Sequence, residues 1–272
     1  MSMPKNLILV RHGQSESNLR QESFKNDDFR LNTEEFMTVP DRSWRLTDTG
    51  REQASCAGEW ISKEFSSGID RYFVSPFTRT RETAACLNLS DPRWEENRVI
   101  RERSWGEIDS IPLKQFAEEY PQNAILKKKD PLYWTPPAGE SIASVADNRV
   151  RNLLSTLHRE NEEENVLLVT HGEFMWAMRL ILERWSDEEY LMKDSDPQEK
   201  IYNCTVFHYS RVNPVTNEVS RKLNWVRKSY PKFNNETNSF VMEESDWIEF
   251  DTPYLSNSDL LERVNTQTQR IH

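Results

Sequence analysis

Two short apolar segments, far apart in the chain, both end in a histidine. Residues 7–10 (LILV) lead into Arg11 and His12, residues 165–170 (NVLLVT) lead into His171, and a glycine follows each histidine. Short apolar runs of this kind, bounded by glycine, are typical of buried strands. Burying a polar group without a partner is unfavourable, so strands that end in arginine and histidine need compensating groups. We expect the rest of the chain to supply them.

Around these two runs the sequence predicts alternating helices and strands. Thr47 is the expected N-cap of a helix whose apolar face continues to Phe65. The other predicted elements are strands at 71–74 and 99–100, helices at 78–87, 141–157 and 174–185, and a hairpin of residues 204–209 and 220–226. Such alternation indicates an α/β fold, a three-layer sandwich whose mostly parallel central sheet is flanked by helices.

The polar residues that follow the predicted strands are expected to meet. In a mostly parallel sheet the functional site lies outside the carboxyl ends of the strands. Three predicted strands end at Arg11 and His12, at Glu102 and at His171, and a fourth leads into Arg79. Side chains from four separate parts of the sequence should therefore gather at one edge of the sheet.

Two histidines, two arginines and one carboxylate in one place suggest phosphoryl transfer. A transferring phosphoryl group carries charge on three oxygens, so catalysis is mostly positioning and charge stabilisation. Arg11 and Arg79 can bind those oxygens in bidentate fashion. A neutral histidine can attack phosphorus, and Glu102 can protonate the leaving oxygen and then accept a proton from water. A zinc site is rejected, because the neighbouring arginines would repel the cation.

Charge and composition exclude several classes of protein. The net charge of -10 argues against nucleic-acid binding, which favours a basic surface. No apolar run approaches the length of a membrane span, and the first residues do not resemble a signal peptide. Cys56, Cys86 and Cys204 are odd in number and far apart, which favours a reducing compartment. We expect a cytoplasmic protein that acts on a small phosphorylated substrate.

Several sequence blocks resemble those of the histidine phosphatase superfamily, also called the phosphoglycerate mutase-like family. The blocks are RHGQSESN, LTDTG, SPFTRTRET, GES and THGE, which occur in the family's order between about residues 7 and 209. RHG alone is a weak signal, whereas five blocks in order, with the expected strands and helices, are a strong one. The resemblance implies the family's three-layer fold, its phosphatase or mutase chemistry, and no metal or nucleotide cofactor.

The resemblance also implies a role for individual residues. His12 falls at the phospho-accepting nucleophile, and Asn18 at the family's asparagine near the phosphate. The residues expected to hold the phosphate oxygens are Arg11, Arg79 and His171. Glu102 falls where the family has its proton donor, with Glu107 as a rival close by.

Some alternatives stay open in the sequence. Arg81 competes with Arg79 as the phosphate ligand of its helix, although the spacing from Ser75 favours Arg79. Ser15 could contact phosphate or cap a helix equally well. Glu173, which follows the second histidine and glycine, receives no role because this position varies within the family.

The leading hypothesis is a phosphatase that forms a phosphohistidine on His12. The alternative is a phosphoglycerate-type mutase. Mutases of this family commonly carry an adjacent arginine pair in the insert after the proton donor, whereas this insert has lysines at 127–129. A third hypothesis, from another class of protein, is a non-catalytic phosphate-binding protein.

Two segments are not explained by the motifs. Residues 19–45 are long for a plain connection and are expected to carry short structure or to cover a site. We divide the chain into a catalytic domain at 1–228 and a C-terminal extension at 229–272 that packs on it. The sequence leaves a homo-oligomer open.

Overall fold

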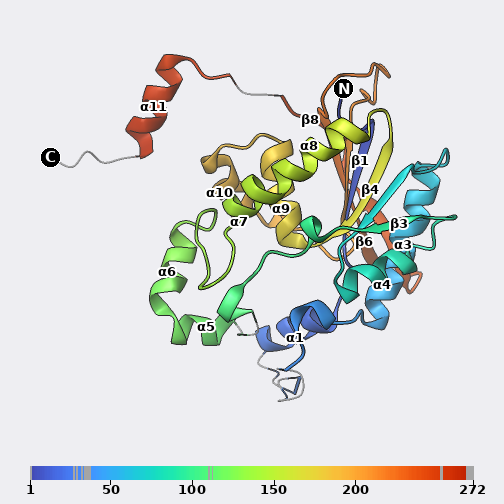
Figure 1. Ribbon diagram of the computed structural model, residues 1–272. Coiled ribbons are helices and arrows are strands. Elements are labelled where there is room, and N and C mark those ends of the chain that lie inside the picture. Colours follow the sequence, from blue (N-terminus) through green and yellow to red (C-terminus); the bar gives the residue numbers. More distant parts are fainter. Residues whose placement is uncertain are drawn as a thin grey trace.

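The computed structural model describes residues 2–26, 28, 30–31, 33, 38–109, 111, 113–251 and 254–267, and these residues contain one mixed sheet. The strand order is β3-β2-β4-β1-β5-β6-β7, and β8 pairs with β6 (Figure 1). The strands are β1 (Asn6–Arg11), β2 (Arg71–Val74), β3 (Trp94–Glu96), β4 (Asn165–Thr170), β5 (Val206–Ser210), β6 (Trp225–Asn234), β7 (Ser239–Glu244) and β8 (Ile248–Glu249). Strands β3, β2, β4 and β1 are parallel, and the remaining strands are added antiparallel.

Helices lie on both faces of this sheet (Figure 1). The helices of the described residues, including α5 and α6 of the insert and α11 near the C-terminus, are α1 (Glu16–Lys25), α3 (Asp48–Glu64), α4 (Thr78–Cys86), α5 (Leu113–Glu119), α6 (Pro121–Lys129), α7 (Ile142–Val145), α8 (Arg151–Glu160), α9 (Gly172–Leu182), α10 (Asp187–Ser195) and α11 (Asn257–Gln267). A π-helical turn, Ala146–Val150, joins α7 to α8. Among the described residues, no helix is both long and apolar enough to cross a membrane.

Strand β1 buries apolar side chains on both of its faces, so the sheet needs a layer of helices on each side. Leu7 and Leu9 pack in the core cluster with α8 and α9, whereas Ile8 and Val10 pack in the second cluster with α3 and α4. All four side chains are 0% exposed, and each contributes roughly 1.5–3 kcal/mol by leaving water. Because successive side chains of a strand point to opposite faces, this strand requires cover on both sides. The three-layer sandwich is confirmed.

The predicted start of helix α3 is confirmed. The Thr47 hydroxyl accepts a hydrogen bond of 3.1 Å from the Gly50 amide, as expected of an N-cap. The helix then buries Ala54, Ala57 and Ile61 against the sheet.

The predicted strand at residues 99–100 is wrong. These residues belong to a 3-10 turn, Arg98–Ile100, and the third parallel strand is β3. The side chain of Asn97 accepts a hydrogen bond of 2.9 Å from the Val99 amide and so starts the turn directly after β3. Ile100 is buried, and its carbonyl accepts a 2.6 Å hydrogen bond from the hydroxyl of Thr170 at the end of β4, which keeps the segment of Glu102 at this edge of the sheet.

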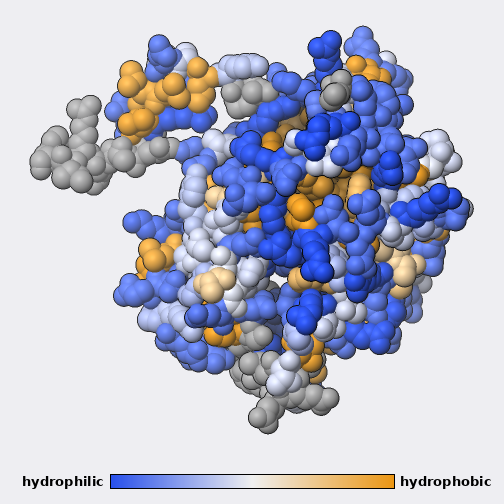
Figure 2. Space-filling model, in the orientation of Figure 1, coloured by the Kyte–Doolittle hydropathy of each residue, from blue (hydrophilic) through white to orange (hydrophobic). Residues whose placement is uncertain are grey.

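The predicted hairpin corresponds to β5 and β6, which pair antiparallel. Strand β6 crosses the predicted domain boundary at residue 228, and β7 pairs along its outer half. The sheet is therefore continuous across that boundary, and the division into two domains stays a prediction. Helix α11 lies apart from the sheet in Figure 1, and Figure 2 shows apolar surface gathered on it. Leu260, Leu261 and Val264 are its exposed apolar side chains.

Two glycines let the end of β1 approach the first turn of α3. A Cβ atom on Gly50 would lie 2.1 Å from the carbonyl oxygen of Gln14, and one on Gly13 would lie 2.3 Å from the carbonyl oxygen of Gly50. Both obstacles are backbone atoms, which cannot rotate away. The helix is thus fixed directly against the segment that carries His12.

We expect Gly50→Ala to lower the free energy of unfolding by about 1–3 kcal/mol, because the added methyl group overpacks a backbone contact. Urea denaturation measures this. Glu52→Ala, on the exposed side of the same helix, is the control and should change stability by no more than about 0.5 kcal/mol. Equal unfolding midpoints for Gly50→Ala and the parent protein would contradict the close contact.

Candidate active site

The two histidines meet because β1 and β4 are neighbouring parallel strands in register. Arg11 pairs with Thr170, so His12 and His171 leave the sheet at the same level. The amide of His12 donates a 3.0 Å hydrogen bond to the carbonyl of Thr170. The two imidazole rings lie 5.3 Å apart between centroids, with their planes inclined at 63°. Both side chains are buried.

Hydrogen bonding fixes the tautomer of His12. Its Nδ1 atom lies 2.8 Å from the carbonyl oxygen of Gly13. A carbonyl only accepts, so Nδ1 carries the proton and the lone pair of Nε2 is available for attack. Burial, followed by the charges of Arg79 and Arg11, lowers the pKa of His12 well below 6.5. The ring is therefore neutral at neutral pH, as nucleophilic attack requires.

His171 forms its hydrogen bond through the other ring nitrogen, Nε2. The Ser75 hydroxyl, at the end of β2, lies 2.8 Å from Nε2 of His171. When this hydroxyl donates to Nε2, the proton resides on Nδ1, which is buried and has no hydrogen-bond partner in the part of the chain that the structure describes. Burial and the charge of Arg79 lower the pKa of His171, so the ring is neutral, and in this tautomer its Nδ1 is the donor.

The two predicted phosphate-binding arginines are both in this cluster. Nη1 of Arg11 donates to the carbonyl of Ile201 at 2.6 Å, and its Nε is buried without a partner among the described residues. Arg79 is 4% exposed and acts electrostatically on both histidines. Its rival Arg81 forms an exposed ion pair of 2.6 Å with Glu96. Arg79 is thus the arginine of α4 that belongs to the site.

Glu102 is half-buried near the two arginines, whose charges act on it. Burial, followed by the charge of Glu173, raises the pKa of Glu102 to about 7. One carboxylate oxygen accepts a 2.9 Å hydrogen bond from the Arg103 amide. The rival Glu107 is exposed in the 3-10 turn Gly106–Ile108. A carboxyl group with a pKa near 7 can both donate and accept a proton at neutral pH.

The segment that carries Glu102 is held by the GES block. The carboxylate of Glu140 accepts hydrogen bonds from the amide of Ser104 at 2.9 Å and from Arg101 at 3.3 Å. It also lies 3.5 Å from Nε of buried Arg149, which donates to the carbonyl of Arg101. These bonds on both sides of Glu102 fix its backbone.

Comparison with known proteins agrees with this arrangement. Residues 7–199 match the sequence model of the histidine phosphatase superfamily (branch 1). The chain belongs to the histidine phosphatase superfamily. A phosphoglycerate mutase-like protein of Arabidopsis thaliana is 30% identical over 207 residues, which are 69% of this chain and 60% of that protein. The chain therefore matches less than two thirds of this plant relative.

Further relatives of this superfamily member include mutases and phosphatases. The 2,3-bisphosphoglycerate-dependent phosphoglycerate mutase 2 of Gloeobacter violaceus is 28% identical over 67% of this chain and 78% of its own length. A solved mycobacterial glucosyl-3-phosphoglycerate phosphatase is 20% identical, covers 76% of this chain and 92% of its own, and superposes with a TM-score of 0.58. The structural similarity shows the fold.

Asn18, which the resemblance assigns near the phosphate, lies in the first turn of α1. Its Oδ1 accepts hydrogen bonds from the Ser15 amide at 3.2 Å and from Asn203 at 3.0 Å. Asn203 also donates to the carbonyl of His12 at 3.2 Å. Ser15 is the N-cap of α1, the structural alternative left open by the sequence. Asn18 is therefore linked to the site, and its phosphate contact stays a prediction.

Four residues of the site neighbourhood had no predicted role: Asp41, Ser75, Glu173 and Asn203. Asp41 forms an ion pair with Arg79, and Glu173 lies 3.3 Å from Nε of Arg103. The length of the segment 19–45 was a signal that something covers the site, but it singled out no residue. Asn203 could not be found from the sequence, because only the fold brings it beside His12.

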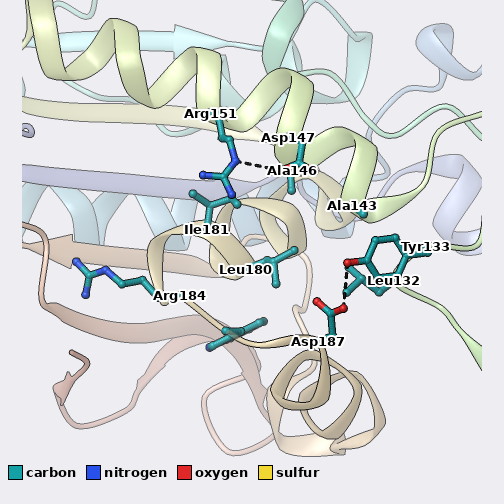
Figure 3. Close-up of a pocket in the computed structure, with 11 residues that line it drawn as sticks. Leu132, Tyr133, Ala143, Ala146, Asp147, Arg151, Leu180, Ile181, Arg184 and Asp187 are labelled. Atoms are coloured by element: carbon teal, nitrogen blue, oxygen red, sulfur yellow. Dashed lines mark hydrogen bonds and ion pairs between the residues drawn. The ribbon is translucent and has the colours of Figure 1, made fainter. Parts of the chain in front are cut away.

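A separate pocket of about 420 Å³ lies between the π-helical turn and the end of α9 (Figure 3). None of the predicted catalytic residues lines it. Two of its carboxylates have partners: Asp147 binds Arg151 at 3.0 Å, and Asp187 accepts a hydrogen bond from Tyr133 at 3.0 Å. The candidate active site is therefore distinct from this pocket.

We expect the rings of His12 and His171 to remain neutral as the pH is lowered from 8 to about 5.5, because burial and the arginines lower both pKa values. Ring chemical shifts from NMR measure this, and the variants His12→Gln and His171→Gln assign the signals. An ordinary imidazole would titrate near pH ~6.5. Titration of either ring near that pH would contradict the electrostatic description of the site.

Proposed function

We propose that this chain hydrolyses small phosphomonoesters through a covalent phosphohistidine on His12. The observation that carries the proposal is a pair of buried donors, Arg11 Nε and His171 Nδ1, that lack partners among the described residues. A buried donor without an acceptor costs about 1–3 kcal/mol. A phosphoryl group bound between them would offset that cost, because its oxygens accept several hydrogen bonds at once.

In the first step, Nε2 of His12 attacks phosphorus and the bond from phosphorus to the ester oxygen breaks. Arg11, Arg79 and His171 donate to the equatorial oxygens, where negative charge is spread. Glu102, protonated, gives its proton to the leaving oxygen, so that a neutral alcohol departs. The phosphoryl group then resides on His12.

In the second step, the Glu102 carboxylate accepts a proton from water as the water oxygen attacks phosphorus. The phosphorus–nitrogen bond breaks, inorganic phosphate is released, and neutral His12 and protonated Glu102 are restored. A pKa of about 7 suits a residue that donates in one step and accepts in the next.

A phosphoglycerate-type mutase is the second candidate, because sequence relatives include such mutases. The two activities share the first step and differ in whether water or a second hydroxyl accepts the phosphoryl group. The insert after the proton donor has lysines at 127–129, at the end of α6, where mutases of the family commonly have an arginine pair. This difference argues for hydrolysis. Nζ of Lys127 lies 4.8 Å from the Trp105 ring and 5.5 Å from the Trp134 ring, so it packs within the insert.

Compartment and partners stay predictions. A cytoplasmic location rests on the spacing of the three cysteines. The absence of nucleic-acid partners rests on the net charge of -10. A small phosphorylated substrate is part of the proposed activity itself.

His12→Ala should reduce hydrolysis of an aryl phosphate by at least about a thousandfold, because the other histidine of the cluster, His171, has its Nε2 engaged by Ser75. Release of inorganic phosphate measures the rate, and an acid-quenched reaction should yield phosphohistidine only in the parent protein. His158→Gln, a histidine of α8 away from the cluster, is the matched control. Activity retained in His12→Ala would exclude the proposed mechanism.

Incubation with 3-phosphoglycerate separates the remaining functions. Inorganic phosphate as the product indicates hydrolysis, and an isomeric phosphoglycerate indicates the mutase. Binding of orthophosphate without turnover of a broad panel of esters would indicate the non-catalytic phosphate-binding protein.

Glu102→Gln should slow hydrolysis of an alkyl phosphate by about 10²–10⁴-fold and that of an aryl phosphate much less, since an aryl leaving group needs little protonation. Glu107→Gln is the control and tests the rival residue. The raised pKa of about 7 means that Glu102 loses its proton above that pH. For the parent protein, kcat/KM for the alkyl ester should therefore fall above about pH 7. This decrease at high pH should be absent in Glu102→Gln and present in Glu107→Gln.

A further inference from the structure

Arg79, one of the two arginines of the candidate phosphate site, already binds a carboxylate of the protein itself. The guanidinium of Arg79 binds both carboxylate oxygens of Asp41, with Nη1–Oδ1 at 3.0 Å and Nη2–Oδ2 at 3.2 Å. Nη1 also donates to the backbone carbonyl of Asp41 at 2.7 Å. Two parallel N–H···O bonds from one guanidinium are the geometry in which arginine binds phosphate.

Arg11, the other arginine of the cluster, binds a neutral carbonyl where Arg79 binds a carboxylate. Its Nη1 donates to the neutral carbonyl of Ile201, and no carboxylate lies within ion-pair distance of it in the described part of the chain. Of the two arginines in the cluster, only Arg79 therefore has its charge matched by a carboxylate. A phosphoryl group that needs both arginines must compete with Asp41 for one of them.

We propose that the Asp41 carboxylate is an internal stand-in for the phosphoryl group, which binds Arg79 between catalytic cycles and leaves it when phosphate enters. Asp41 thereby weakens the affinity for phosphate and speeds release of inorganic phosphate. This inference rests on the proposed function, because it concerns the same anion site.

The burial of the two partners indicates which one moves. The side chain of Arg79 is 5% exposed and that of Asp41 is 28% exposed. Asp41 begins the 3-10 turn Asp41–Ser43, and Trp44 directly after the turn is buried. The turn is therefore anchored at its end while Asp41 lies at its more exposed start. Asp41 is therefore the partner that can move toward solvent, whereas buried Arg79 stays in place to bind the entering phosphate oxygens.

Asp41 also contributes to the charge balance of the site. Its charge raises the pKa of Glu102 and that of Asp109, whereas the charge of Arg79 lowers both. Three carboxylates thus surround one guanidinium, and an entering phosphate would add further negative charge. Departure of Asp41 reduces this repulsion at the time when Arg79 is needed by the phosphoryl oxygens.

The test measures the dissociation constant of orthophosphate at pH 8 by calorimetry for the parent protein, Asp41→Asn and Asp109→Asn. Asp41→Asn removes the charge and keeps the backbone bond to Arg79. Asp109→Asn is the matched control: it removes an equal charge near Arg79, with which it makes no ion pair within the described residues. We expect Asp41→Asn to lower the dissociation constant roughly tenfold, in line with exchange of one charge-assisted bond. Asp109→Asn should change it by no more than about threefold.

A double-mutant cycle completes the test. In an Arg79→Ala background, Asp41→Asn should change the dissociation constant by no more than the control substitution does, about threefold, because only its general charge effect is left once the partner is gone. Equal constants for Asp41→Asn and the parent protein, or equal effects of Asp41→Asn and Asp109→Asn, would overturn the inference while leaving the proposed function intact. If neither the parent protein nor Asp41→Asn binds orthophosphate, the proposed function fails and the inference fails with it.

Discussion

The parallel pairing of β1 with β4 is the constraint on which the site depends. It places Arg11 opposite Thr170, so the next residue of each strand is a histidine at the same sheet edge. The pairing is stabilised by side chains that are buried on both faces, since Leu9 and Val10 each contact a different helical layer. The core that holds the sandwich together thus also sets the distance between the two imidazoles.

Burial of these charged and polar groups gives the site its chemistry. In water, two imidazoles would be partly protonated and a glutamic acid fully ionised at neutral pH. In the folded protein, burial moves His12 toward the neutral form and Glu102 toward the protonated form. Each shift favours the state that the first step of phosphoryl transfer needs. The same low-dielectric surroundings contain Nε of Arg11 and Nδ1 of His171, which have no hydrogen-bond partner among the described residues.

The sequence predicted the parts of the structure that are encoded locally. The strands ending at His12 and His171 and the cap at Thr47 have clear apolar patterns and turn chemistry. The β-branched pair at 99–100 was misassigned, because strand propensity is overridden there by the Asn97 side chain. The contact between Asp41 and Arg79 joins residues 38 positions apart, with no periodicity between them, so only the folded chain reveals it.

The bond between His12 and the Gly13 carbonyl has a chemical consequence of its own. An imidazole has two nitrogens, and small-molecule phosphorylation of histidine can give two regioisomers. Here Nδ1 is engaged with the main chain, so the phosphohistidine that we propose would be the tele isomer, with phosphorus on Nε2. A glycine carbonyl, which no side-chain substitution removes, therefore selects the ring nitrogen that would form the proposed adduct.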